Sequence, residues 1–320
     1  MTVEEFIAEW RNSSPTVTVK TSGSTGAPKP MEAEKCRMAA SARITCRFLG
    51  LREGDTALLC LPMDYIAGKM MVVRALTCGL QLVSVAPSSH PLADLDTAPA
   101  FAAMTPMQVW ETLRNERERS LFERIKNVII GGGAISSPLA AGLRQMPEAV
   151  WSTYGMTETL SHIALRRLSG CGASEWYTPF EGVGLSLDAR GCLVIDAPAV
   201  CATTLTTNDM AELRKSDGVT RFRITGRADN VICSGGIKIQ AEEVERLLEG
   251  RINVPYVITW RADERLGQAV ALVMEAGDVE AARKTCDEIL PRYWRPKTIE
   301  SVTQLPRTET GKLKRNIFTK

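Results

Sequence analysis

Thr21-Ser22-Gly23-Ser24-Thr25-Gly26-Ala27-Pro28-Lys29 follows a short run in which apolar residues alternate, including Val17 and Val19. The glycines of this segment let backbone N–H groups approach an anion, the hydroxyls add hydrogen-bond donors, and the lysine adds a positive charge. This combination is typical of a loop that binds phosphate. A flexible Gly/Ser linker has a similar composition, but a linker has no need of the Pro-Lys end.

A Walker-type nucleotide loop needs four residues between its glycines and then Lys followed by Ser or Thr. Here Gly23 and Gly26 are too close together and Lys29 precedes Pro30, so that interpretation fails. The segment instead resembles the T-S-G-[ST]-T-G-x-P-K-G signature of the adenylate-forming ligases (acyl-CoA synthetases, luciferases and adenylation domains of peptide synthetases), with Pro30 in place of the last glycine. The resemblance implies the following ligands for the ATP phosphates: Thr21, Ser22, Gly23, Ser24, Thr25, Gly26 and Lys29.

The length and charge of the chain restrict its class. A chain of 320 residues exceeds one small core, so two domains are expected. With 39 Lys and Arg against 37 Asp and Glu, the net charge of +2 argues against a nucleic-acid partner. The start of the chain lacks the features of a signal peptide, and no apolar run reaches the length of a membrane span. A cytoplasmic location without a membrane partner is therefore the expectation.

Cysteine and histidine usage points away from metal centres. The nine cysteines include no C-x-x-C pair, and they are expected to be reduced thiols that pack like small apolar side chains. His90 and His162 are the only histidines, which argues against a histidine metal site or a histidine-based triad.

Apolar periodicity predicts an α/β fold in which a mostly parallel sheet is flanked by helices. Helices are expected at 3–11, 32–48, 66–78 and 105–117, and strands at 15–21, 56–61, 81–86, 127–130 and 149–153. A small β-rich part should cover 163–210, and a smaller C-terminal α+β domain should follow it. The predicted domains are 1–226, which would bind nucleotide and acyl group, and 227–320, a mobile lid with its hinge near Asp229.

The second strong motif is Tyr154-Gly155-Met156-Thr157-Glu158, which follows a predicted strand. It resembles the family's [NQGS]-x-Y-G-x-T-E, in which the tyrosine stacks on adenine, the threonine binds the α-phosphate and the glutamate holds Mg²⁺. The residue types suit these roles, because an aromatic face suits a purine and a hard dication prefers a carboxylate.

Gly132-Gly133-Ala134 also follows a predicted strand, and by itself it indicates only a tight strand-to-helix turn. In the ligase family a Gly-Gly-Ala at this place lies along the adenine ring. Tyr65 occupies the His position of the family's Leu-Pro-x-x-His-x-x-Gly segment, which gates the acyl pocket. Tyr65 is therefore a candidate for the acyl pocket. Lys69 of the same segment and His162, four residues beyond Glu158, are the other candidates, although each also has an ordinary structural interpretation.

The segment around Asp209 resembles the family's Thr-Gly-Asp-[LV], whose aspartate binds the ribose hydroxyls, with Asn208 in place of the glycine. Asn tolerates the left-handed backbone that Gly would supply. Residues 226–245 resemble G-R-x-D-[DE]-x-I-[KN]-x-x-G-x-x-I-x-x-x-E-[IV]-E. By that resemblance Arg227 reaches ribose or phosphate, and Asp229 is the hinge between the domains.

In the same motif, Gly235 and Gly236 would lie beside the pantetheine channel of CoA. Residues 306–315 resemble P-x-[TN]-x-x-G-K-[LIV]-x-[RK], whose lysine bridges the carboxylate and the α-phosphate during adenylation. Lys312 is accordingly the predicted catalytic lysine, acting with Thr157 and Glu158.

The resemblance runs from Thr21 to Arg315 and implies an AMP-forming acid:CoA ligase that uses ATP, Mg²⁺, CoA and a carboxylic acid. The short start of the chain and the segment 64–71 resemble bacterial o-succinylbenzoate:CoA ligases of menaquinone synthesis, and Lys69 or Arg74 would then meet a second carboxylate. Family members carry a long subdomain before the phosphate loop, whereas twenty residues precede it here. Either the remaining sheet is self-sufficient or a second subunit covers the gap, so a homodimer is a hypothesis.

Two alternatives to CoA ligation remain at this point. An aryl or amino acid adenylation enzyme that loads a carrier protein would share every motif and differ only in its thiol acceptor. A degenerate nucleotide-binding protein without catalysis is the other alternative, suggested by Pro30, Asn208 and the short start of the chain.

Overall fold

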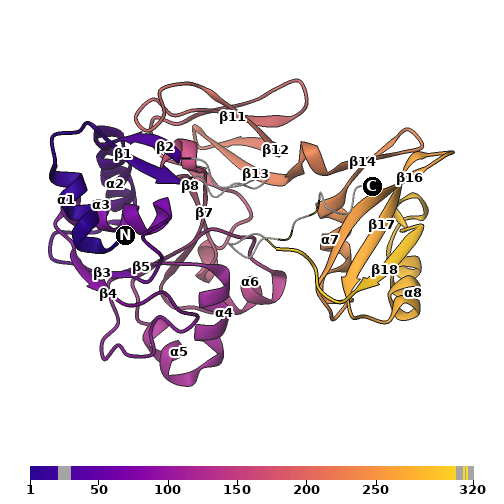
Figure 1. The fold of residues 1–320 in the computed structure, drawn as a ribbon, viewed down its shortest axis with the longest axis horizontal. Coiled ribbons are helices and arrows are strands. Elements are labelled where there is room, and N and C mark those ends of the chain that lie inside the picture. Colours follow the sequence, from indigo (N-terminus) through magenta and orange to yellow (C-terminus); the bar gives the residue numbers. More distant parts are fainter. Residues whose placement is uncertain (21–29, 308–312, 314, 316–320) are drawn as a thin grey trace. The chain divides into compact units, whose positions relative to one another are not determined.

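The structure is a computed structural model and describes residues 1–20, 30–307, 313 and 315. The chain divides into two compact units, which are coloured along the sequence in Figure 1. Unit 1 contains Met1–Leu185, Ile195–Leu205 and Arg214–Phe222, and unit 2 contains Ser186–Val194, Thr206–Leu213 and Arg223–Lys320. Within the described residues no helix has both the length and the apolar character that crossing a bilayer requires.

Unit 1 is built on a seven-stranded sheet with the order β4-β3-β5-β6-β7-β8-β9. The five strands from β4 to β7 run parallel to one another, and β8 and β9 are antiparallel to their neighbours. The strands are β3 (Thr56–Leu59), β4 (Gln81–Ser84), β5 (Phe101–Met104), β6 (Asn127–Ile130), β7 (Ala149–Gly155), β8 (His162–Arg167) and β9 (Thr178–Pro179). The α/β expectation of a mostly parallel sheet is confirmed.

Helices cover both faces of this sheet because successive residues of a strand point to opposite faces. Ala57, Leu59 and Phe101 pack in one core with α1 (Val3–Arg11), α2 (Lys35–Leu49) and α3 (Ile66–Cys78). Leu58 and Ala102 pack in the other core with α4 (Pro106–Arg114), α5 (Glu116–Phe122) and α6 (Ser137–Leu143). This three-layer arrangement places the carboxyl ends of the parallel strands at one edge of the sheet.

The predicted helix 32–48 is wrong at its start, because Pro30–Glu34 forms strand β2. This strand pairs antiparallel with β1 (Thr16–Lys20), in a register that sets Lys20 opposite Pro30. The hydroxyls of Thr16 and Thr18 each donate a 2.7 Å hydrogen bond to the Glu32 carboxylate across the hairpin. Pairing with the preceding strand therefore overrides the helical periodicity, and α2 begins at Lys35.

The predicted helix 105–117 is two helices. α4 begins with a capping box between Thr105 and Gln108, and its last turn ends at Asn115. The Asn115 side chain then accepts a hydrogen bond from the Glu118 N–H and caps α5. An asparagine side chain can cap the start of a new helix, so the chain turns at Asn115. The pattern of charged residues alone did not predict this boundary.

Unit 2 contains a five-stranded sheet and two helices near the end of the chain. The sheet order is β15-β14-β17-β16, and β18 pairs with β17. The elements are β14 (Val231–Ser234), β15 (Ile237–Gln240), α7 (Ala241–Leu248), β16 (Tyr256–Asp263), β17 (Gly267–Glu275), α8 (Val279–Ile289) and β18 (Thr298–Val302). Both helices pack on the sheet face that carries Ile258 and Leu272, while Val257 and Val273 face Leu305.

The remaining strands form a four-stranded sheet with the order β10-β11-β12-β13, and its residues are divided between the two units. They are β10 (Gly184–Leu187), β11 (Cys192–Asp196), β12 (Leu205–Ser216) and β13 (Val219–Arg227). Four short 3₁₀ turns complete the described elements, at Thr157–Thr159, Gly170–Gly172, Ala228–Asn230 and Arg292–Trp294.

Candidate active site

The predicted adenine loop follows β6, at the edge of the sheet where open α/β folds bind their ligands. A Cβ on Gly131 would lie 2.6 Å from the Thr153 Oγ1 atom of the adjacent strand, so only glycine fits. Gly132 has a φ of +83°. A Cβ on Gly133 would lie 3.5 Å from Pro106, the first residue of α4. The loop is thus packed closely between β7 and α4.

The Tyr-Gly-x-Thr-Glu motif lies at the end of the neighbouring strand β7, where a bulge separates Tyr154 from Gly155. A Cβ on Gly155 would lie 2.3 Å from the Ser161 carbonyl oxygen, which explains the glycine. The Thr159 hydroxyl closes the turn, since it accepts from the Met156 N–H at 3.0 Å and donates to the Ser161 carbonyl at 2.7 Å. The turn therefore holds a fixed shape, with Leu160 at a φ of +63°.

Tyr154, the predicted adenine-stacking residue, belongs to an aromatic cluster within unit 1. Its ring centroid lies 5.8 Å from that of Tyr177 and 5.0 Å from that of Phe222, and the latter two rings stack at 5.3 Å. The Tyr177 hydroxyl lies 2.9 Å from the Ser152 Oγ atom. The motif did not reveal Tyr177 and Phe222, because neither lies near it in sequence. They fix the plane of Tyr154 through edge contacts.

Thr157 and Glu158, the predicted α-phosphate and Mg²⁺ ligands, differ in exposure. Thr157 is 7% exposed, and Glu158 is exposed beside it in the 3₁₀ turn. Within the described residues, no ion pair engages the Glu158 carboxylate. A free, exposed carboxylate is the kind of hard oxygen donor that Mg²⁺ prefers, so Glu158 fits a magnesium ligand.

A buried polar network joins α3, β8 and α2. The Arg74 guanidinium donates to the Ser161 Oγ atom at 2.8 Å, and that atom lies 3.2 Å from His162 Nδ1. His162 Nε2 lies 3.2 Å from the Thr45 hydroxyl. Burial and the nearby Arg74 charge hold the pKa of His162 well below its ordinary value, so the imidazole is neutral.

Arg74 is 2% exposed, and no carboxylate in the described part of the chain pairs with it. Among the residues that the structure describes, its Nε atom is buried without a hydrogen-bond partner, and Nη1 lies 3.5 Å from the Met71 sulfur. Burial lowers the pKa of this guanidinium to about 10, against the opposing effect of the Cys46 and Cys78 thiols. A buried cation without a counter-ion is costly, which makes Arg74 a candidate for an anionic ligand.

The three predicted acyl-pocket residues have different surroundings. His162 lines a small cavity of unit 1, whose other walls are Ser41, Ile44, Ile163, Phe180, Glu181, Gly182, Val183, Ala197, Ala199 and Val200. Tyr65 is the N-cap residue of α3 and does not line it. The Lys69 ammonium, which is 4% exposed, donates to the Thr18 carbonyl at 2.7 Å and lies 5.5 Å from the Phe6 ring. Lys69 thus fastens the β1–β2 hairpin to α3.

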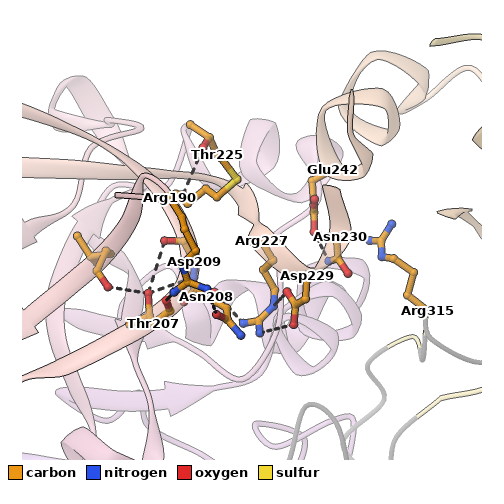
Figure 2. A network of polar contacts seen from close by, with 12 residues as sticks. Arg190, Thr207, Asn208, Asp209, Thr225, Arg227, Asp229, Asn230, Glu242 and Arg315 are labelled. Atoms are coloured by element: carbon orange, nitrogen blue, oxygen red, sulfur yellow. Dashed lines mark hydrogen bonds and ion pairs between the residues drawn. The ribbon is translucent and has the colours of Figure 1, made fainter. Parts of the chain in front are cut away.

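Unit 2 brings together Asp209, Arg227 and Asp229 (Figure 2). Arg227 donates two hydrogen bonds to the Asp229 carboxylate, at 3.0 and 2.9 Å, and a third to Asp209 at 2.8 Å. The hydrogen bond to Asp229 raises the pKa of the Arg227 guanidinium. The predicted ribose ligand and the predicted hinge residue thus share one cation.

Arg190 is a member of this group that the motifs did not reveal. Its guanidinium donates to the Asn208 Oδ1 atom at 3.1 Å and to the Thr207 carbonyl at 3.3 Å, as Figure 2 shows. It also binds Asp188 at 2.9 Å. The asparagine that replaces the family's glycine therefore has a side-chain partner beside Asp209. Asn208 itself lies within strand β12 and does not have a positive φ, so the left-handed backbone expected at this position is wrong.

Gly235 and Gly236 form the tight turn between β14 and β15, with φ angles of +56° and +85°. A Cβ on Gly235 would lie 3.0 Å from Leu266. The predicted phosphate ligands at positions 21–29 and the predicted catalytic Lys312 lie outside the described residues. The roles assigned to individual residues stay predictions.

Comparison with known proteins identifies the family. The pattern of the AMP-binding enzyme family matches residues 6–199. An acyl-CoA synthetase (AMP-forming)/AMP-acid ligase II-like protein from Dyadobacter fermentans is 35% identical, with a TM-score of 0.68 over 98% of this chain and 92% of that one.

Two longer relatives extend the comparison. A 2-succinylbenzoate–CoA ligase from Bacillus cytotoxicus is 28% identical over 338 residues, which cover 93% of this chain and 68% of the ligase. The o-succinylbenzoate-CoA synthetase of Bacillus subtilis, solved with ATP and magnesium, has a TM-score of 0.76 at 21% identity and shares the fold, with 68% of its length covered. The family pattern and these relatives place the chain in the AMP-binding enzyme family, among the AMP-forming acyl-CoA synthetases.

Proposed function

We propose that this chain is an acid:CoA ligase whose acid carries a second carboxylate, with o-succinylbenzoate as the leading candidate. The observation that carries the choice of acid is Arg74, a buried guanidinium without a carboxylate partner in the described residues. Ser161 and His162 connect it by hydrogen bonds to the wall of the small cavity of unit 1. Relatives named 2-succinylbenzoate–CoA ligases support the same class of acid.

In the proposed first step, the acid's carboxylate oxygen attacks the α-phosphorus of ATP and pyrophosphate leaves, which yields an acyl-adenylate. Two anions approach each other, so catalysis must be largely electrostatic. Residues 21–29 would bind the β- and γ-phosphates, Thr157 the α-phosphate, and Lys312 the charge between the reacting groups. Mg²⁺ would be held by Glu158, and when bound it neutralises the phosphate oxygens.

The nucleoside would be held by residues from two groups. Tyr154 would stack on adenine above the loop of Gly132, Gly133 and Ala134. Asp209 and Arg227 would bind the ribose.

In the proposed second step, the CoA thiol attacks the acyl carbonyl carbon, the thiol proton is released and AMP leaves. Lys312 must withdraw to admit the thiol, so residues 227–320 would act as a lid that turns near Asp229. Gly235 and Gly236 would border the pantetheine channel, since side chains there would narrow it.

The proposal is tested by pyrophosphate exchange into ATP, with a panel of aromatic and dicarboxylic acids. We expect o-succinylbenzoate to support exchange, and benzoate and other monoacids to support it poorly. Arg74→Met should lower kcat/KM for the diacid by about 10²-fold or more, because one charge-assisted contact is lost, while activity on monoacids is spared. Arg43→Met, an exposed position on α2, is the control. Equal use of monoacids and diacids by the wild type would refute the choice of acid.

The same exchange assay, together with a test for acylation of CoA, distinguishes the two alternatives to CoA ligation. If exchange occurs but CoA is not acylated, a carrier-protein acceptor replaces CoA in the proposal. If no acid supports exchange, the chain is a degenerate nucleotide-binding protein. The joint presence of Glu158, Asp209, Arg227 and Lys312 argues against degeneration.

A further inference from the structure

Arg190 lies in the turn that joins β10 to β11, and the backbone of this turn is fixed. Asp188 Oδ1 accepts a hydrogen bond from the Arg190 N–H at 2.8 Å and one from the Cys192 N–H at 2.9 Å. The Asp188 carbonyl also accepts from the Gly191 N–H at 3.0 Å, and Gly191 has a φ of +78°, which glycine adopts without strain. The Arg190 side chain therefore starts from a well-defined place.

The guanidinium of Arg190 connects this turn to strand β12. Nε and Nη2 lie 2.9 and 2.8 Å from Asp188 Oδ2, and this carboxylate raises the pKa of the guanidinium. On the other side, Nη1 donates to Asn208 Oδ1 at 3.1 Å and Nη2 to the Thr207 carbonyl at 3.3 Å (Figure 2). Because a guanidinium is planar and donates in fixed directions, these contacts together fix the distance between the turn and β12.

The residues that Arg190 holds determine where Asp209 lies. The Thr207 hydroxyl donates to the Leu193 carbonyl of β11 at 2.8 Å and accepts from the Asp209 N–H at 3.1 Å. The Asp209 Oδ1 atom accepts from Arg227 at 2.8 Å. The backbone of Asp209 is thus held through Thr207 and its carboxylate through Arg227, and all of these residues belong to unit 2.

We infer that Arg190 is a positioning residue for the ribose, which holds Thr207 and Asn208 so that the Asp209 carboxylate meets the ribose hydroxyls. A hydrogen bond weakens steeply when its angle departs from linear, so a carboxylate that accepts from hydroxyls depends on its placement. Arg190 acts through Asp209 and does not itself contact the nucleotide. The inference rests on the proposed role of Asp209.

The ratio of the Kd for 2′-deoxy-AMP to the Kd for AMP measures this role in the full-length chain, by isothermal titration calorimetry. The wild type should bind AMP more tightly, because the deoxynucleotide lacks one hydroxyl. For Arg190→Met we expect the ratio to fall by about 3–10-fold, with little change in the Kd for 2′-deoxy-AMP. Arg190→Lys should behave like Arg190→Met, since an ammonium keeps the charge but does not reproduce the planar fork.

Asn208→Ala tests the link between Arg190 and β12. This variant removes one of the two acceptors on β12, so the ratio should fall by a smaller factor than in Arg190→Met. In the double variant, the loss of Arg190 should cost less than it does alone, because both changes break the same link. Fully additive effects would contradict the link.

Arg223→Met is the matched control. Arg223 of β13 binds the Glu212 carboxylate of β12 with two hydrogen bonds, at 3.0 and 3.1 Å, so it is also an arginine that joins elements of the same sheet. Its loss should lower the Tm about as much as the loss of Arg190 and leave the ratio of the two Kd values unchanged. A merely structural role for Arg190 predicts the same unchanged ratio in both variants, and that result would overturn the inference.

Nucleotide binding without acid or CoA keeps the inference separate from the proposed function. If the wild type fails to exchange pyrophosphate with every acid while Arg190→Met lowers the ratio as expected, the proposed ligation is wrong and the role of Arg190 stands. If exchange occurs and the ratio is the same in Arg190→Met and the wild type, the role of Arg190 is wrong and the proposed ligation stands.

Discussion

Gly155 is the residue at which the backbone of the site is most constrained. The strand β7 ends there against the chain that returns as β8, and a Cβ would meet the Ser161 carbonyl oxygen at 2.3 Å and the His162 Cα atom at 2.4 Å. Both are backbone atoms, which cannot rotate away as a side chain can. The glycine thus lets the Thr157–Glu158 turn lie directly against β8.

Gly155→Ala should lower the free energy of unfolding by about 1–3 kcal/mol, because the backbone must shift to admit a methyl group. It should also weaken ATP binding, because Thr157 and Glu158 move with the turn. Gly142→Ala is the control, since no atom lies within 4 Å of its added Cβ and α6 should gain up to about 1 kcal/mol from the better helix former. Urea unfolding of the two variants checks this, and equal stability would contradict it.

The buried His162 should make the stability of the protein depend on pH. Its pKa in the folded state lies well below the ordinary 6.5, so the unfolded chain binds the proton more readily. The contribution of the neutral His162 to the free energy of unfolding is fully present above pH 6.5. It is lost as the pH falls from that value toward the folded pKa, by up to about 1.4 kcal/mol per pH unit.

His162→Gln has no such proton, so its Tm should fall less steeply between pH 6.5 and pH 5. Calorimetry over that range compares the slopes. Parallel curves for the wild type and the variant would show that another group is responsible.

At the scale of elements, the start of α4 connects the sheet to the predicted adenine loop. The buried Gln108 amide donates to the Cys60 carbonyl at 3.1 Å and to the Ser88 carbonyl at 2.9 Å, and its oxygen accepts from the Thr105 N–H at 3.0 Å. Pro106 of the same turn lies against Gly133. One side chain therefore fixes the helix on which the loop rests.

Gln108→Leu should destabilise the protein by about 2–3 kcal/mol, because two buried carbonyls lose their donor. The KM for ATP should also rise, since the support of Gly133 is loosened. The neighbouring Met107→Leu changes a residue that is 63% exposed and should alter neither quantity. Thermal unfolding and pyrophosphate exchange test both statements, and a wild-type Tm for Gln108→Leu would refute the first.

Elements with strong local signals were predicted well from the sequence. The helices α1 and α3 have the predicted bounds because their apolar spacing and their ends are local properties. β2, β5 and β18 were missed, since a strand of four or five residues is stabilised mainly by its neighbours. The buried β5, Phe101–Met104, carries no alternation because both of its faces are covered.

The candidate site also contains residues with a local sequence signal and residues without one. Short motifs predict roles for Tyr154, Glu158 and Arg227, because such roles depend on residue type at a fixed spacing. The partners of these residues, such as Tyr177 and Arg190, come from other segments, and only folding brings them near. The sequence suggests for Arg74 only that it could meet a second carboxylate. Its burial could not be predicted, because burial depends on how α3 packs against the segment of Ser161 and β8.

At the scale of the whole molecule, the proposed function has two half-reactions at one site, and Lys312 would take part in only the first. Lys312→Ala should abolish adenylate formation, with a loss of about 10²-fold or more, and spare thioester formation from synthetic acyl-adenylate. Rapid-quench measurement of each half-reaction checks the split. Equal loss of both would refute this division of labour.

The chain spans about two thirds of the length of its 2-succinylbenzoate–CoA ligase relatives. The homodimer stays a prediction. Sedimentation equilibrium should give twice the 35.0 kDa mass of the chain. A monomeric mass at micromolar concentration would count against the dimer.

Strand β17 is paired along its length with β16, and its second half is also paired with β18. Amide hydrogens there can be replaced by deuterium only when the surrounding sheet opens. Peptides covering 269–274 should therefore take up label last among those of unit 2. The rate of their deuterium uptake measures how often the sheet of this unit opens. The uptake of any other segment of unit 2 can be compared with that rate, and no substrate is needed.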